Sequence, residues 1–177
     1  PTLVSFAVDV NSCKNIITPE FKKAGSKIVE FKINRDNYDL PDYAQIMDGY
    51  GKLFEDIKAG KILSAYAVEG RGAAEAVSKM AFGNKMGVKI EHNVDPRDFF
   101  GAGWGNIVCE VAEGKVGELS IPYTVLGEVT DKGVFEYGNT VITMDEALAG
   151  WMKTLEDVFP TVTGKEKTGE AARVEEK

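Results

Sequence analysis

Short apolar runs alternate along this chain with longer stretches in which apolar residues recur every three or four positions. The runs hold four to seven residues and are rich in valine and isoleucine, which is typical of β-strands. They predict strands at residues 3–8, 28–33, 62–68, 87–90, 106–111, 123–129 and 134–137. Because a Thr-Asp-Lys-Gly turn at 130–133 joins the last two runs, these two strands are expected to form a hairpin.

The longer stretches predict amphipathic helices. The clearest helix lies between Pro41 and Gly60, and its expected buried face holds Tyr43, Ile46, Met47, Tyr50, Leu53, Phe54 and Ile57. A second helix covers residues 73–81. A third should start after Thr143 and Glu146, which are spaced as a capping box, and should stop before Pro160. Its expected buried side holds Leu148, Trp151, Met152, Leu155 and Val158.

Strands and helices interleave without an internal repeat, so we expect an α+β fold in which a mixed sheet is flanked by helices. This domain is expected to span residues 1–160. From residue 161 the chain is mainly Lys, Glu, Thr and Gly with almost no large apolar residue, and such a segment cannot bury enough surface to offset the entropy of ordering it. Residues 161–177 are therefore expected to be a polar linker.

Composition narrows the class of protein. With 177 residues the chain has the length of one domain, and its net charge of -7 argues against a nucleic-acid partner. No apolar run approaches the roughly 20 residues that span a bilayer, so no membrane partner is expected. Two cysteines, Cys13 and Cys109, and no signal peptide favour a reducing, cytoplasmic setting. Because Pro1 leads directly into an apolar run, we expect a fragment of a longer polypeptide, although removal of a tag would leave the same start.

No catalytic residue and no metal site is predicted, because nucleophile, base and orienting group cannot be assembled from one histidine and two distant cysteines. His92 is expected to be a partly exposed structural residue, and Cys109, in an apolar run, a buried small hydrophobic one. The Gly-x-Gly-x-Gly run at 101–105 precedes a strand, which favours a tight bend over a phosphate loop. The acidic stretches at 42–56 and 145–157 fall mostly on polar helix faces, where charge is solvated.

One turn is a candidate phosphate- or nucleotide-binding site: Glu69, Gly70, Arg71 and Gly72. It follows an apolar strand and opens the helix at 73–81, so the first free amides of that helix would point toward an anion. Glycine allows close backbone approach, and Arg71 adds a positive charge. A strand-to-helix turn also needs glycine for its geometry alone, so the residues leave both interpretations open.

Three segments, in order, resemble the C-terminal domain shared by the aminoimidazole ribonucleotide synthetase superfamily. The early segment of that domain is similar to TPEFKKAGSKIV at 18–29. Its glycine turn, alanine-rich helix and next strand are similar to EGRGAAEAVSKMAFG at 69–83 followed by GVKI at 87–90. Its closing strand and hairpin are similar to YTVLGEVTDKG at 123–133. The resemblance implies the α+β fold of that domain.

Within the superfamily, SKMAFGNK at 78–85 and ALAGWMKTLEDVFPT at 147–161 are most similar to the large, single-chain phosphoribosylformylglycinamidine synthases, at the second copy of this domain. The resemblance implies a parent ligase that uses ATP, magnesium and glutamine to convert formylglycinamide ribonucleotide to the amidine. It implies the ATP-binding and glutaminase domains of the same polypeptide as partners, with residues 161–177 leading toward the glutaminase. The substrate or a nucleotide phosphate would be the ligand. This domain alone is expected to be inactive and to hold no cofactor.

The chain departs from the superfamily pattern at the glycine turn. Relatives carry Asp-x-Ser-Asp-Gly-Gly, in which the first Asp and the Ser can serve nucleotide and magnesium, whereas Ala67 and Glu69 stand at those two positions here. A second departure lies at 113–121, where relatives often place a helix. Two alternatives stay open: another ATP-dependent superfamily member such as aminoimidazole ribonucleotide synthetase, or a noncatalytic interaction domain.

Overall fold

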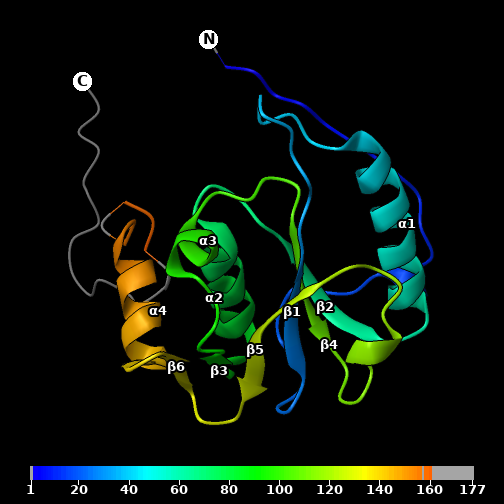
Figure 1. Ribbon diagram of the computed structural model, residues 1–177. Coiled ribbons are helices and arrows are strands. Elements are labelled where there is room, and N and C mark those ends of the chain that lie inside the picture. The colour runs from blue at the N-terminus through cyan, green and yellow to red at the C-terminus, as the bar shows by residue number, and fades with distance from the viewer. Residues whose placement is uncertain (1, 157, 161–177) are drawn as a thin grey trace, which may run out of the picture. The chain divides into compact units, whose positions relative to one another are not determined.

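Seven strands form one mixed sheet in the computed structural model of the chain (Figure 1). Their order across the sheet is β2-β4-β1-β5-β3-β6-β7, and neighbouring strands are antiparallel except β3 and β6, which are parallel. The strands are β1 (Lys27–Phe31), β2 (Ile62–Ala67), β3 (Gly87–Ile90), β4 (Ile107–Val111), β5 (Thr124–Thr130), β6 (Val134–Tyr137) and β7 (Thr140–Thr143). The expected α+β fold with a mixed sheet flanked by helices is confirmed.

The structure describes residues 2–156 and 158–160, and the chain divides into two compact units, Pro1–Met144 and Asp145–Lys177. The first unit holds the sheet together with η1 (Cys13–Asn15), α1 (Tyr43–Lys58), α2 (Gly72–Asn84), α3 (Pro96–Phe100) and η2 (Val116–Glu118). The second holds α4 (Met144–Lys153) apart from its first residue. No helix of the described residues is both long enough and apolar enough to cross a bilayer. The predicted linker at 161–177 lies outside the described residues and stays a prediction.

Side chains alternate between the two faces of the sheet, and each face has its own buried cluster. On one face Ile28 of β1 belongs to a cluster with Val77 and Met80 of α2. On the other face Val29, the next residue of β1, belongs to a cluster with Leu53 of α1. Figure 1 shows α2 and α1 on opposite sides of β1 and β4. The sheet is therefore covered on both faces, which explains why its central strands are apolar runs.

The helices α1 and α3 begin at short polar side chains that cap them. The Asp42 carboxylate accepts a hydrogen bond from the Gln45 amide at the start of α1, which confirms the helix predicted between Pro41 and Gly60. The Asp95 carboxylate does the same for α3, where Pro96 occupies the first turn. The helix α3 was not predicted from the sequence, because five residues are too few to show a helical period. The region 113–121 holds only η2, in line with the missing helix noted above.

The predicted strand at residues 3–8 is wrong. This segment has no regular structure, and Leu3 and Phe6 are 95% and 87% exposed. Its β-prone composition is not sufficient, because an extended segment without a pairing partner gains no ladder hydrogen bonds and no buried face.

The predicted hairpin of residues 123–129 with 134–137 is also wrong. Both segments are strands, β5 and β6, but β3 lies between them and pairs with both. The hairpin of this region is formed by β6 and β7, which pair from Val134 with Thr143 to Tyr137 with Thr140. Gly138 in the two-residue turn between them has a φ of 57°, a conformation that two-residue hairpin turns favour.

The face of α1 that packs on the sheet matches the predicted one only in part. Tyr43 and Met47 are exposed, whereas Gly49 and Asp56 are buried. A Cβ atom on Gly49 would lie 2.2 Å from the ring of Phe31, so the close packing of α1 on this strand residue requires a glycine at position 49. Leu53 is buried and Ile46 and Ile57 pack against the same cluster, so the predicted stripe is confirmed at these three positions. It is wrong at Tyr43 and Met47.

The predicted buried side of the last helix is wrong for Trp151, Leu155 and Val158, which are 56%, 59% and 70% exposed. The helix α4 begins directly after Thr143, as the capping-box spacing predicted, but it ends at Lys153. Leu155 and Val158 therefore lie beyond the helix and do not share a face with Leu148.

Candidate functional site

The candidate turn connects β2 to α2 and is fastened to a second loop. The Glu69 carbonyl accepts hydrogen bonds from the backbone amides of Gly72 and Gly103, both at 3.2 Å. One carbonyl thus closes the turn and also ties it to the loop that precedes β4. Glu69, Gly70 and Arg71 are exposed, and Gly72 is buried. The turn consequently presents three of its four residues to solvent at the start of α2.

The two glycines of the turn have different roles. Gly72 has a φ of +73°, and a Cβ atom there would lie 2.5 Å from the carbonyl oxygens of Phe99 and Gly101. Only glycine fits this backbone geometry. At Gly70 a Cβ atom would lie 3.4 Å from the ring of Trp104, and no unusual φ is needed. The architectural interpretation of the glycines therefore holds at Gly72, while Gly70 is not required by the backbone.

The start of α2 retains capacity for an anion. Within the described part of the chain, the backbone amides of Ala73 and Ala74 have no hydrogen-bond acceptor. The exposed Arg71 precedes them. Glu75 reaches back toward this end of the helix: its pKa is lowered, chiefly by the hydrogen bond from Lys79 and in smaller part by the backbone amide and charge of Arg71. Both alanines are buried, with 1% and 9% of their surface exposed, so the exposed Arg71 guanidinium is the group here that an anion can reach from solvent.

The turn does not fit a magnesium site. Ala67, which stands where the superfamily has an aspartate, is the last residue of β2 and has no side-chain oxygen. Among residues 2–156 and 158–160, no cluster of three or more His, Cys, Asp or Glu side chains could hold a metal ion. Divalent magnesium prefers carboxylate and phosphate oxygens, and the Glu69 carboxylate is the one such side chain that this turn offers.

A cleft of about 260 Å³ lies beside the turn, and the sequence analysis missed it. One wall is the loop at 101–103, whose last residue bonds to the Glu69 carbonyl. The other walls carry charged residues from two distant segments, and only folding brings these together. They include Glu30, Lys32, Arg97 and Asp98. One signal could have been noticed, because Glu30 is an acid inside the apolar run IVEF at 28–31.

Glu30 is the most buried charged residue of the cleft, with 3% of its surface exposed. One carboxylate oxygen accepts a hydrogen bond of 2.8 Å from the Asn106 amide. The other lies 3.8 Å from the Nζ atom of Lys32, too far for a hydrogen bond. Burial raises the pKa of Glu30, and the Asn106 hydrogen bond and the Lys32 charge offset this only in part. Glu30 is therefore a carboxyl group that ionises at unusually high pH and faces a cleft.

The raised pKa of Glu30 makes a prediction about stability. The unfolded chain loses this proton near the ordinary value of 4.5, whereas the folded chain keeps it to higher pH. The protonated Glu30 side chain therefore makes its full contribution to the stability of the folded state at pH values below the ordinary pKa of 4.5. This contribution is lost as pH rises through the pKa that Glu30 has in the folded chain. We expect the free energy of unfolding of Glu30→Gln, relative to the wild type, to increase as pH rises from about 4 to 7. Urea unfolding at several pH values measures this, with Glu113→Gln, an exposed site, as the control for loss of one charge. Parallel curves for wild type and Glu30→Gln would contradict it.

Two other buried acids are structural. Glu110 is fully buried, and its carboxylate accepts hydrogen bonds from the backbone amides of Lys22 and Lys23 and from the Ser64 hydroxyl. Asp56 of α1 is also buried, which corrects its assignment to a solvated helix face. Burial opposes its ionisation, but hydrogen bonds from Lys61 and Ser120 outweigh burial, so its pKa is lowered.

Three further sequence predictions agree with the structure: the exposure of His92, the burial of Cys109 and the bend at 101–105. His92 lies exposed in the turn after β3. Cys109 is fully buried, and burial raises the pKa of its thiol to about 12, so it stays neutral and behaves as a small hydrophobic residue. The glycine run at 101–105 is a bend that leads into β4.

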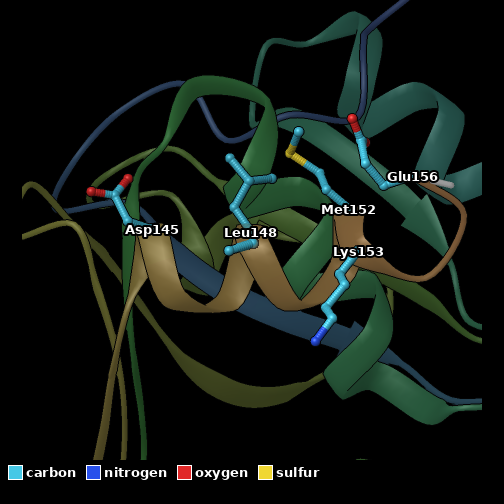
Figure 2. Close-up of a pocket in the computed structure, with 6 residues that line it drawn as sticks. Asp145, Leu148, Met152, Lys153 and Glu156 are labelled. Carbon is cyan, nitrogen blue, oxygen red and sulfur yellow. The ribbon is translucent and has the colours of Figure 1, made fainter. Parts of the chain in front are cut away.

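A second pocket, of about 500 Å³, lies along α4 and is lined only by residues of the second unit. Figure 2 shows Leu148 and Met152 projecting to the same side of the helix, as expected for residues four positions apart. Asp145, Lys153 and Glu156 complete its lining with charged groups. It shares no residue with the turn or with the cleft.

The α+β fold of this chain is similar to that of several solved structures. Solved structures with a similar fold include PurL, phosphoribosylformylglycinamidine synthase. For phosphoribosylformylglycinamidine synthase II from Thermotoga maritima, the TM-score is 0.62 at 13% identity, over 74% of this chain and 27% of that chain. For T. maritima PurL complexed with FGAR, it is 0.63 at 12% identity, over 76% and 30%. For HypE from E. coli, it is 0.56 at 15% identity, over 73% and 52%.

These likenesses establish the fold. The chain spans less than a third of the length of the PurL chains that it matches. No family model matches the sequence.

Proposed function

We propose that this chain acts as one domain of a phosphoribosylformylglycinamidine synthase, a cytoplasmic ligase of purine biosynthesis. The observation that carries the proposal is the fold of the PurL chains, which covers about three quarters of this chain while the resembling segments follow the superfamily's order. The parent enzyme would use ATP to activate the amide oxygen of formylglycinamide ribonucleotide, and ammonia from glutamine would then displace phosphate. Its ATP-binding and glutaminase domains are the proposed partners.

In this proposal the domain contributes one wall of a composite site. Phosphoryl transfer depends on positioning and on neutralising charge, so a domain that only holds a phosphate is useful to it. The exposed Arg71 at the start of α2 would hold a phosphate of the substrate or of the nucleotide. Magnesium would be held by other parts of the parent enzyme, because Ala67 offers it no ligand.

The proposal predicts weak phosphate binding at the turn. We expect inorganic phosphate to bind the chain with a dissociation constant on the order of millimolar, because one or two charge-assisted hydrogen bonds must compete with water. Arg71→Ala should weaken this binding about fivefold to tenfold. Amide NMR titration measures both, with shifts expected at residues 70–74.

The control for this titration is Lys14→Ala, which removes one exposed positive charge away from the turn. It should leave the affinity at the turn unchanged. Equal affinities for wild type and Arg71→Ala, or shifts only outside residues 70–74, would remove the turn from the proposal.

A noncatalytic interaction domain is the second candidate function, and two observations favour it. The turn lacks the superfamily's acidic ligands, and Tyr43 and Met47 leave an apolar stripe of α1 exposed. Such a domain would dock to its partners and bind no ligand. It would show no phosphate-dependent shifts at the turn, which separates it from the first proposal.

A further inference from the structure

The Glu30 carboxylate forms the floor of the cleft beside the turn. Glu30 projects from β1 with one oxygen bonded to Asn106 and the other without a hydrogen-bond donor at 3.8 Å from Lys32. At the rim of the cleft, Lys32 donates a hydrogen bond of 3.3 Å to Asp98. This oxygen is not among the buried polar atoms that lack a partner, so it reaches the solvent of the cleft, where an entering N–H group can donate to it.

One wall of the cleft is the backbone of the loop at 101–103, and neighbouring residues that pack against this loop fix its position. A Cβ atom on Gly103 would meet Asn106 and Val68 at 2.8 and 2.9 Å, and one on Gly101 would meet the Arg97 carbonyl at 2.6 Å. Asn106 bonds to Glu30 through its amide group and accepts from the Ile33 amide through its oxygen. The position of Glu30 is therefore fixed by packing and hydrogen bonds before any ligand binds, which favours binding.

The rim of the cleft carries one cation that has no assigned partner. Arg35 lines the cleft but donates to the carbonyls of Asp39 and Trp104. Lys32 is shared between Glu30 and Asp98. In the described part of the chain, the guanidinium of Arg97 has no ion pair or hydrogen bond, and this residue is exposed. Arg97 is suited to a phosphate or a carboxylate.

We propose that this cleft binds a small ligand that carries both an N–H donor and an anionic group, with the donor on Glu30 and the anion on Arg97. The volume of about 260 Å³ lies below that of pockets for drug-sized molecules, roughly 300–1,000 Å³, so the ligand is small or inserts one end. The proposal does not rest on the proposed function, because the turn and the cleft use different side chains.

The test uses the whole chain and O-phosphoethanolamine, which has an ammonium and a phosphate group. Inorganic phosphate and ethylammonium each supply only one of these groups. We expect O-phosphoethanolamine to shift the amides of Ala102, Gly103 and Asn106 and to bind at least about fivefold more tightly there than either control, because two charge-assisted contacts are made together. β-Alanine in its place shows whether a carboxylate can replace the phosphate.

Three variants assign the contacts. Glu30→Gln retains the shape of the floor and the hydrogen bond from Asn106, and Arg97→Ala changes an exposed side chain, so both should fold. Each should weaken O-phosphoethanolamine binding at the cleft about tenfold, the loss of one charge-assisted hydrogen bond. Arg71→Ala should leave it unchanged, which separates the cleft from the turn. The proposal is overturned if O-phosphoethanolamine and phosphate bind the cleft equally, or if Glu30→Gln and Arg97→Ala bind as the wild type does.

Discussion

Replacing Gly72 with alanine is expected to lower the free energy of unfolding by about 3–5 kcal/mol. The added Cβ atom would lie 2.5 Å from two carbonyl oxygens, those of Phe99 and Gly101, and the residue would need a φ of +73°. Both obstructing atoms are backbone oxygens, one within α3 and one directly after it, so they cannot move aside as a flexible side chain would. Urea unfolding followed by circular dichroism measures the change.

Gly70→Ala is the matched control for this prediction. Gly70 lies in the same turn, but its added Cβ atom would meet only the edge of the Trp104 ring, at 3.4 Å, and its φ is an ordinary one. We expect a change of less than about 1 kcal/mol. Equal effects of the two substitutions would mean that the loop at 99–101 does not cross the start of α2 as closely as described.

Removing the Glu110 side chain is expected to cost about 3–5 kcal/mol. In Glu110→Ala the backbone amides of Lys22 and Lys23 and the Ser64 hydroxyl lose their shared acceptor, and a cavity opens in a fully buried position. The segment that carries Lys22 and Lys23 should detach first, because these two bonds hold it to β4. Hydrogen exchange of the two amides together with urea unfolding tests this.

The substitution Glu110→Gln tests the contribution of these hydrogen bonds without removing the volume of the side chain. Each Glu110 oxygen accepts at least one backbone amide, so an amide group must place its NH₂ against a donor whichever way it turns. We expect a loss of about 1–3 kcal/mol although the volume is unchanged. Glu113→Ala, at an exposed acid nearby in sequence, should change stability by less than about 0.5 kcal/mol. If Glu110→Gln were as stable as the wild type, these hydrogen bonds would contribute nothing net.

Periodic patterns predicted most elements because the sheet has helices on both faces. A run such as that at 28–33 stays apolar when both of its faces are buried, and α1 shows a clear helical rhythm beside its Asp42 cap. Short elements were missed, since α3 has five residues and β7 has four exposed ones. The pairing of the strands could not be predicted from the hydrophobic pattern, because β3, from a distant part of the chain, lies between β5 and β6 in the sheet.

The candidate site was only partly predictable. The turn is a contiguous motif, so Glu69 to Gly72 could be identified from sequence and from the family resemblance. The cleft is assembled from segments near residues 30, 97 and 103, and nothing local joins them. Only the acid at Glu30 inside an apolar strand was a readable signal, because a charge in such a run is rare unless it has a partner or a function.

Titration of the chain with formylglycinamide ribonucleotide, followed by amide NMR, tests the central claim most directly. The claim is that this synthetase-type domain contributes the turn at 69–72 as a phosphate contact of the ligase. It predicts shifts at residues 70–74 that saturate in the millimolar range and are strongly reduced in Arg71→Ala. Shifts absent from the turn at about 10 mM ligand, or unchanged in Arg71→Ala, would contradict it.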